Sequence, residues 1–135
     1  MVSRGPRILL ALASFLLALG SAMHASAFHK AVKAVAVSNL PAFFGNALKG
    51  LWLADSTTMF ALALIFGLFA IKPWAASRAA VILTSLIPAG IAAMIYLFMG
   101  AFFAGHLLLL SAMLALIAGT QFPASRTSIS AIQEA

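Results

Sequence analysis

The sequence has no cysteine, and among its 135 residues only Asp55 and Glu134 are acidic. The absence of cysteine excludes disulfides, thiolate zinc sites, iron–sulfur clusters and cysteine nucleophiles. Charged residues make up 7% of the chain, whereas an average soluble domain carries about 25%. Because 64% of the residues are hydrophobic, a water-soluble fold of this size would have too little interior to bury them. The sequence therefore predicts that lipid surrounds most of the chain.

The few charges that are present are mostly basic and give a net charge of +6. The eight lysines and arginines lie between apolar runs, where they would meet the anionic headgroups of a bilayer. No basic run is interleaved with aromatic residues, so we expect the lipid bilayer as a partner and no nucleic acid.

Four apolar runs each have about the 20 residues that a helix needs to cross a bilayer. They predict an all-α integral membrane protein, a four-helix up–down bundle that forms a single transmembrane domain over residues 1–135. The predicted spans are 8–28, 51–71, 79–99 and 102–120, followed by a flexible polar tail over 121–135.

Small residues recur at four-residue spacing in every predicted span, which places them on one helix face where backbones can pack closely. These faces are Ser14, Ala18 and Ala22; Ala63 and Gly67; Ser85, Ala89 and Ala93; and Ser111, Ala115 and Gly119. We expect the contacts between helices to form along them.

The run over residues 8–28 also has the layout of a secretory signal peptide. Arg4 and Arg7 precede it, and the tripeptide Ala-Ser-Ala at 25–27 matches an A-x-A cleavage site. The same run is long enough to remain as a first transmembrane helix, and its small face favours that interpretation. Cleavage would instead leave three spans and place the new N-terminus outside.

The segment 28–50 is more polar than the spans and predicts a short helix at the membrane interface between the first two of them. Phe28, Val32 and Val35 lie on one helical stripe, and the lysines of the segment fall off that stripe. Pro41 is expected to end this helix. An ordinary connecting loop is the alternative interpretation.

The distribution of basic residues predicts the orientation in the membrane. With four spans, five basic residues lie on the side of the termini and three on the other side, so the positive-inside rule predicts that both termini are cytoplasmic. The two sets are Arg4, Arg7, Lys72, Arg78 and Arg126, and Lys30, Lys33 and Lys49. By hydropathy the chain is similar to small bacterial proteins of the inner (plasma) membrane, where we expect it to reside.

This orientation brings three ionisable residues, His24, Asp55 and His106, to a similar depth in the outer leaflet. Ionisable groups inside a membrane usually face the bundle interior and mark function. Two imidazoles and a carboxylate suit a divalent transition metal, and two histidines on facing helices suit a haem. In the simpler interpretation, Asp55 caps a helix that begins at Ser56, and both histidines are interfacial.

The sequence contains no motif that specifies a reaction, so the favoured function is non-enzymatic. We expect a small multi-pass protein that acts by association with itself, as a homo-oligomer, or with a larger membrane complex. One alternative is a metal- or haem-binding protein that uses His24, Asp55 and His106. Another is a small proton-coupled transporter with Asp55 as the titrating group and Pro88, in the third span, as the hinge.

Overall fold

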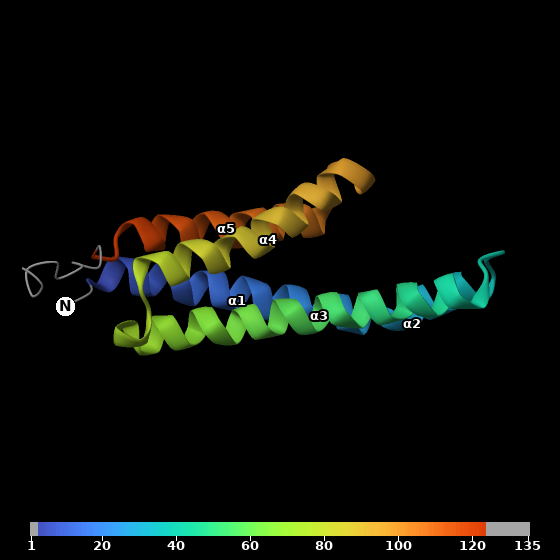
Figure 1. The fold of residues 1–135 in the computed structure, drawn as a ribbon, viewed down its shortest axis with the longest axis horizontal. Helices are drawn as coiled ribbons and strands as arrows, with labels where there is room; N and C mark the ends of the chain where they lie inside the picture. Colours follow the sequence, from blue (N-terminus) through green and yellow to red (C-terminus); the bar gives the residue numbers. More distant parts are fainter. Residues whose placement is uncertain (1–2, 124–135) are drawn as a thin grey trace, which may run out of the picture.

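The fold is all-helical, and the computed structural model in Figure 1 describes residues 3–123. No strand occurs within that range. The elements in chain order are α1 (Arg4–Ser26), α2 (Phe28–Ala36), α3 (Ala42–Ile71), the 3-10 helix η1 (Pro73–Ala75), α4 (Arg78–Met99) and α5 (Phe103–Thr120).

Four helical stretches are long and apolar enough to cross a membrane, as the sequence predicted. They are Arg4–Ala36, which joins α1 and α2, and the helices α3, α4 and α5. The chain is therefore compatible with a multi-pass membrane protein. Most of the tail predicted at 121–135 lies outside the described residues.

The second span begins earlier than its hydropathy indicated. α3 starts at Ala42, directly after Pro41, rather than at Leu51. Proline fixes its own backbone but does not prevent the following residues from becoming helical, so residues 42–50 form the first turns of α3. Its 30 residues extend about 45 Å, which exceeds the roughly 30 Å thickness of a bilayer core.

The short helix predicted after the first span is present as α2, which has no buried residue. Figure 1 shows that α2 continues the line of α1 and lies beside the first turns of α3. The contact is close at Gly45, where an added Cβ would lie 2.8 Å from Val35 Cγ1. α2 and the start of α3 therefore form an extension of the first helix pair.

α1 and α3 are joined by a regular ladder of hydrogen bonds. Arg7 Nε donates to Ala70 O at 2.9 Å, Ser14 Oγ to Ala63 O at 2.7 Å, and Ser21 Oγ to Ser56 O at 2.8 Å. The donors lie seven residues apart on α1, and the acceptors lie seven residues apart on α3. Side chains at this spacing share one helix face, so the ladder fixes the register of the pair.

The predicted small faces account for part of this packing. Ser14 meets Gly67 so closely that a Cβ on the glycine would lie 3.1 Å from the serine hydroxyl oxygen. Ala63 of the same predicted face is buried. Ala22, however, is exposed, because the buried face of α1 is the stripe Pro6, Leu10, Ala13, Leu17 and Ser21.

α4 and α5 form the second helix pair, which packs through small residues. Ser111, Ala115 and Gly119 are all buried, as their spacing predicted. An added Cβ on Gly119 would lie 2.9 Å from Ile82 Cγ1 of α4, so the two backbones approach closely here. The serines in this pair bond within their own helices: Ser111 Oγ donates to Leu107 O.

The two pairs meet through α1, which packs against both α3 and α5. α3 and α4 touch only slightly, although they are adjacent in the chain. Figure 1 shows the pairs close together near the N-terminus and diverging toward the other end. α1 is thus the helix that holds the two halves together.

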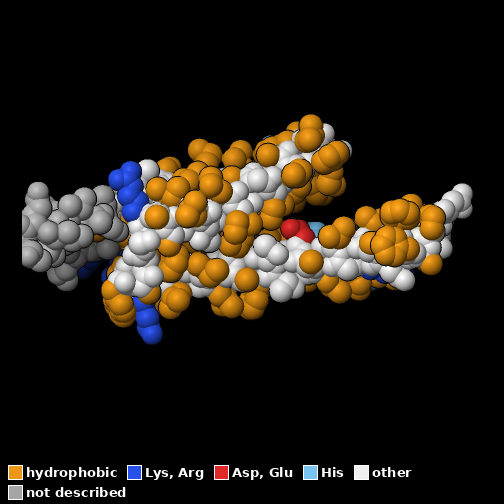
Figure 2. Space-filling view, viewed as in Figure 1, with side chains coloured by type: hydrophobic (Ala, Val, Ile, Leu, Met, Phe, Trp, Pro, Cys, Tyr) orange, Lys and Arg blue, Asp and Glu red, His pale blue; other side chains and the backbone are white. Residues whose placement is uncertain are grey.

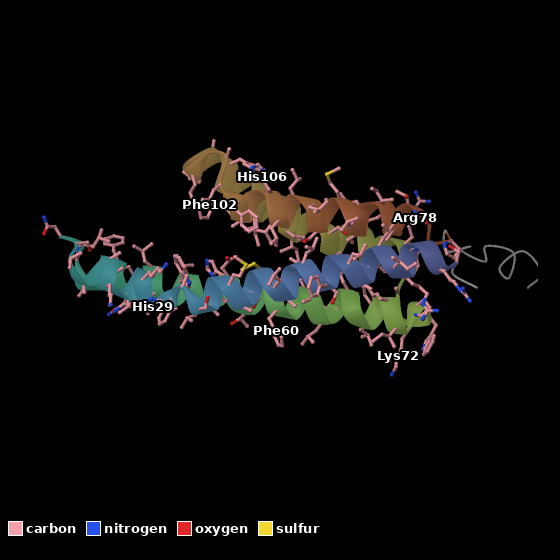
Figure 3. The ribbon with its side chains drawn as sticks, turned by 180° about the vertical axis from the view of Figure 1, so that it is seen from behind. His29, Phe60, Lys72, Arg78, Phe102 and His106 are labelled. Carbon is pink, nitrogen blue, oxygen red and sulfur yellow. The ribbon has the colours of Figure 1, made fainter. Side chains whose placement is uncertain are left out.

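The outer surface is mostly apolar. Figure 2 shows hydrophobic side chains along the whole length of the visible face, with the most prominent blue basic side chains at one end. Lys72 and Arg78 lie at the same end as the N-terminus (Figure 3). Many large hydrophobic residues are exposed, among them Phe60 of α3 and Leu83 of α4. Lipid is the solvent that makes such a surface favourable.

Candidate functional site

The structure brings together two of the three ionisable residues that the sequence singled out. His24 Nε2 of α1 lies 3.6 Å from Asp55 Oδ2 of α3, with the two side chains 25% and 31% exposed. Each residue lies 17 positions along its helix from a basic residue at the other end, Arg7 and Lys72 respectively. This separation corresponds to about 25 Å, which is close to the roughly 30 Å thickness of a bilayer core.

A set of polar contacts holds the imidazole in place. Trp52 stacks on the His24 ring with centroids 4.3 Å apart and planes inclined by 12°. Trp52 Nε1 also donates to His24 O at 2.8 Å. The other ring nitrogen, Nδ1, lies 2.9 Å from Ser56 Oγ. Trp52 and Ser56 of α3 therefore contact the ring face and Nδ1 of His24, and these contacts fix the orientation of the imidazole.

Ser56 connects the imidazole to the backbone of α3. Ser56 Oγ donates to Trp52 O at 3.1 Å and lies 2.9 Å from His24 Nδ1. His24 Nε2 faces the Asp55 carboxylate. The two ring nitrogens therefore contact two different side chains of α3, and the imidazole lies between Ser56 and Asp55.

This pair lies in the wall of a cleft between the two helix pairs. The cleft has a volume of about 750 Å³, and its lining comes from α1, α3, α4 and α5. Apart from His24 and Asp55, the lining is almost entirely apolar. Figure 2 shows the red acidic side chain and a pale blue imidazole in the notch where the pairs separate.

His106 does not reach this cleft. Its Nδ1 lies 2.6 Å from Tyr96 Oη on α4, and the two rings are tilted by 52°. Figure 3 shows His106 on the side of α5 away from α1 and α3, whereas Phe102 lies toward them. Phe102 is among the residues that line the cleft and His106 is not.

Comparisons with known proteins do not assign the site. No family model, no curated protein and no solved structure matches the chain. Inferences about function therefore come from the geometry of the described residues.

The structure does not show the predicted three-residue metal site. Within residues 3–123, no three His, Cys, Asp or Glu side chains form a group that could hold a metal ion. His24 and Asp55 supply two donors, and His106 is directed elsewhere. Because His106 points away from α1, it does not face His24 as a second histidine ligand of a haem would.

The interpretation of Asp55 as a helix cap is wrong. Asp55 lies in the middle of α3, which begins at Ala42, so its carboxylate is not needed by free backbone N–H groups. His29 is exposed, and its Nδ1 bonds to Ser26 O within the same stretch of chain, as an interfacial histidine would.

Sequence reasoning missed two members of the site, Trp52 and Ser56. Trp52 has the position of an interfacial anchor, and only the contact with α1 reveals its second function. The available signal was the spacing of Trp52, Asp55 and Ser56, because residues three and four apart share a helix face.

Proposed function

We propose that this protein crosses the inner (plasma) membrane four times in alternating directions and acts by binding an apolar molecule in the cleft. The cleft between the two helix pairs carries the proposal. Its volume of about 750 Å³ lies within the usual range of ligand pockets, roughly 300–1,000 Å³. Its apolar lining and few polar groups are also typical of such sites. This function requires no catalytic residue.

The orientation is part of the proposal. Arg4, Arg7, Lys72 and Arg78 belong to one end of the helices, and the basic residues of α2 and early α3 belong to the other. The larger set favours the cytoplasm, so both termini are placed there and the cleft faces the outer leaflet. Single cysteines at Ser3 and Ala101, both exposed, test this orientation, because a membrane-impermeant maleimide should label only the cysteine at position 101 in intact cells.

We also propose that α1 is retained rather than cleaved as a signal peptide. Leu10, Ala13 and Leu17 of α1 are fully buried, and α1 links the two pairs. Removing α1 would leave the buried faces of α3 and α5 without the helix that packs against them. N-terminal sequencing of the mature protein should therefore begin before Leu10, and a start after Ala27 would contradict retention.

Native mass spectrometry tests whether the cleft binds a molecule. The protein, purified in mild detergent, should carry a non-covalent adduct of lipid or small-molecule mass. Ala104→Trp fills the cleft, because Ala104 lines it, and should abolish the adduct. Ala93→Trp is the matched control, since Ala93 is exposed on α4 outside the cleft and its adduct should persist. Equal loss in both variants, or no adduct in any, would refute cleft binding.

Association with a second copy or a larger complex is a second proposal, and a different surface supports it. Gly50, Ala54, Thr57 and Ala61 are exposed on the face of α3 opposite its buried stripe. Small residues at this spacing allow helices to pack closely in lipid. Because the chain has no cysteine, Ala54→Cys gives a unique crosslink, and oxidation in membranes should yield dimer. Leu83→Cys on α4 is the control and should stay monomeric.

Proton-coupled transport is the alternative that the His24–Asp55 pair favours, because the pair places two ionisable side chains in the wall of the cleft. In this alternative Asp55 exchanges its proton for the ligand, and movement of α4 about Pro88 changes access. Reconstituted vesicles with an imposed pH gradient should then accumulate the ligand, and Asp55→Asn should abolish accumulation without abolishing expression.

A further inference from the structure

We propose that the occupant of the cleft is a lipophilic organic cation, whose charge is paired with Asp55. This inference rests on the proposed function and adds the chemical class of the ligand. Three features of the cleft carry it: its size, its content of methionine and aromatic side chains, and its single carboxylate.

The size of the cleft favours a small molecule over a partner helix. A helical turn about 10 Å across and 5.4 Å long occupies about 420 Å³. The cleft, at about 750 Å³, holds fewer than two such turns. A transmembrane helix from another chain would therefore extend far beyond it, whereas a molecule with a few aromatic rings fits inside.

The lining is rich in polarizable side chains. Four of the six methionines in the chain line the cleft, together with Trp52, Phe98, Phe102 and Phe103. Methionine is flexible and adapts to differently shaped ligands, and it packs favourably on aromatic rings. The faces of tryptophan and phenylalanine attract cations. Such a lining suits an aromatic cation better than a saturated hydrocarbon chain.

The charge of the cleft has one sign. Asp55 is the only acidic residue within 3–123, and no lysine or arginine lines the cleft. An anion would meet the carboxylate without a counter-charge, and a neutral molecule would leave it without a new partner. An organic cation pairs with the carboxylate. Charge complementarity thus selects the cation.

His24 is a positioning residue in this arrangement. Its ring is fixed by Trp52 and Ser56 and lies 3.6 Å from the carboxylate, which lines the cleft. The Asp55 side chain is 31% exposed and lines the cleft, so a ligand in the cleft can reach it.

Three probes of similar size and different charge test the inference. Tetraphenylphosphonium is a cation, tetraphenylborate is an anion, and triphenylphosphine is neutral. Binding to the protein in an uncharged maltoside detergent is measured by equilibrium dialysis. The cation should bind about tenfold more tightly than the neutral probe, and the anion should bind weakest. Asp55→Asn should remove the preference for the cation, and Asp55→Glu should preserve it.

Control variants separate a specific effect from misfolding. Thr120→Val changes an exposed residue at the end of α5, outside the cleft, and should leave cation binding unchanged. Circular dichroism and elution volume should match among all variants that are compared. If Asp55→Asn does not fold, the charge comparison on the unmodified protein still decides the question.

The possible outcomes are distinguishable. If cation and neutral probe bind equally and Ala104→Trp abolishes both, the cleft binds apolar molecules and the inferred ligand class is wrong. If neither probe binds in the cleft, the proposed function fails as well. If phosphatidylethanolamine displaces tetraphenylphosphonium as well as unlabelled cation does, the occupant is a lipid headgroup and not a free organic cation, which also overturns the inference.

Discussion

The two helix pairs are similar in hydrophobicity but are held together in different ways. Between α1 and α3, side chains such as Ser14 and Ser21 donate hydrogen bonds to the backbone of the partner helix. Between α4 and α5, the buried serines Ser85 and Ser111 donate to their own helices. The second pair is held by close backbone contact at residues such as Gly119. Equally apolar helices can thus be joined either by polar bonds or by the fit of small residues.

The largest effect is expected where the second pair depends on fit. Gly119→Leu places a branched side chain where even a Cβ would lie 2.9 Å from Ile82. Overpacking of this kind costs about 1–3 kcal/mol. Loss of folded protein during titration with a denaturing detergent measures this cost.

Gly90→Leu is the matched control for that experiment. Gly90 is also inside a transmembrane helix of the second pair, but an added Cβ meets nothing within 4 Å. It should leave stability unchanged or raise it slightly through better helix propensity. Equal destabilisation by both substitutions would mean that α4 and α5 do not pack at Gly119.

A smaller effect is expected where the first pair depends on hydrogen bonds. Ser21→Ala removes a bond between helices, and such bonds in membrane proteins contribute about 0.6 kcal/mol on average. Ser111→Ala removes a bond within one helix and should cost less, because that bond does not join α5 to another helix. If the two serines gave equal losses in the same detergent titration, the distinction between the pairs would be wrong.

The smallest effect is expected at the exposed hydrogen bond of the second pair. Tyr96→Phe removes the bond to His106 and leaves the packing of the ring. His106 is exposed, so solvent or headgroups replace the lost partner, and folding stability should hardly change. Proton NMR of a selectively labelled imidazole should show the change at His106 alone, with His24 unaffected.

Residue counting predicted depth along the helices but not rotation about them. His24 and Asp55 were placed at the same level from the lengths of the spans, and the structure pairs them. His106 was placed at that level by the same reasoning, yet its side chain lies on the α4 side of α5. A turn of about 100° per residue separates facing from non-facing positions, and an evenly apolar helix such as α5 gives no pattern from which to read that angle.

The start of α3 shows a second limit. Hydropathy predicted that the helix begins at Leu51, because residues 42–50 are less apolar than the residues that follow. A helix, however, can extend through less apolar residues when its backbone hydrogen bonds form and no residue interrupts them. The close contact between Val35 and Gly45 then stabilises the first turns of α3. The span that can cross a membrane and the helix that contains it are therefore different segments.

The ladder between α1 and α3 limits how the cleft can change shape. Its three bonds repeat every seven residues on both helices. Any axial slide shorter than about 10 Å would break all three at once, and a slide of that length would restore only two. α1 and α3 are therefore held in a fixed axial position relative to each other. The width of the cleft therefore changes through movement of α4 and α5 and not through sliding of α1 against α3.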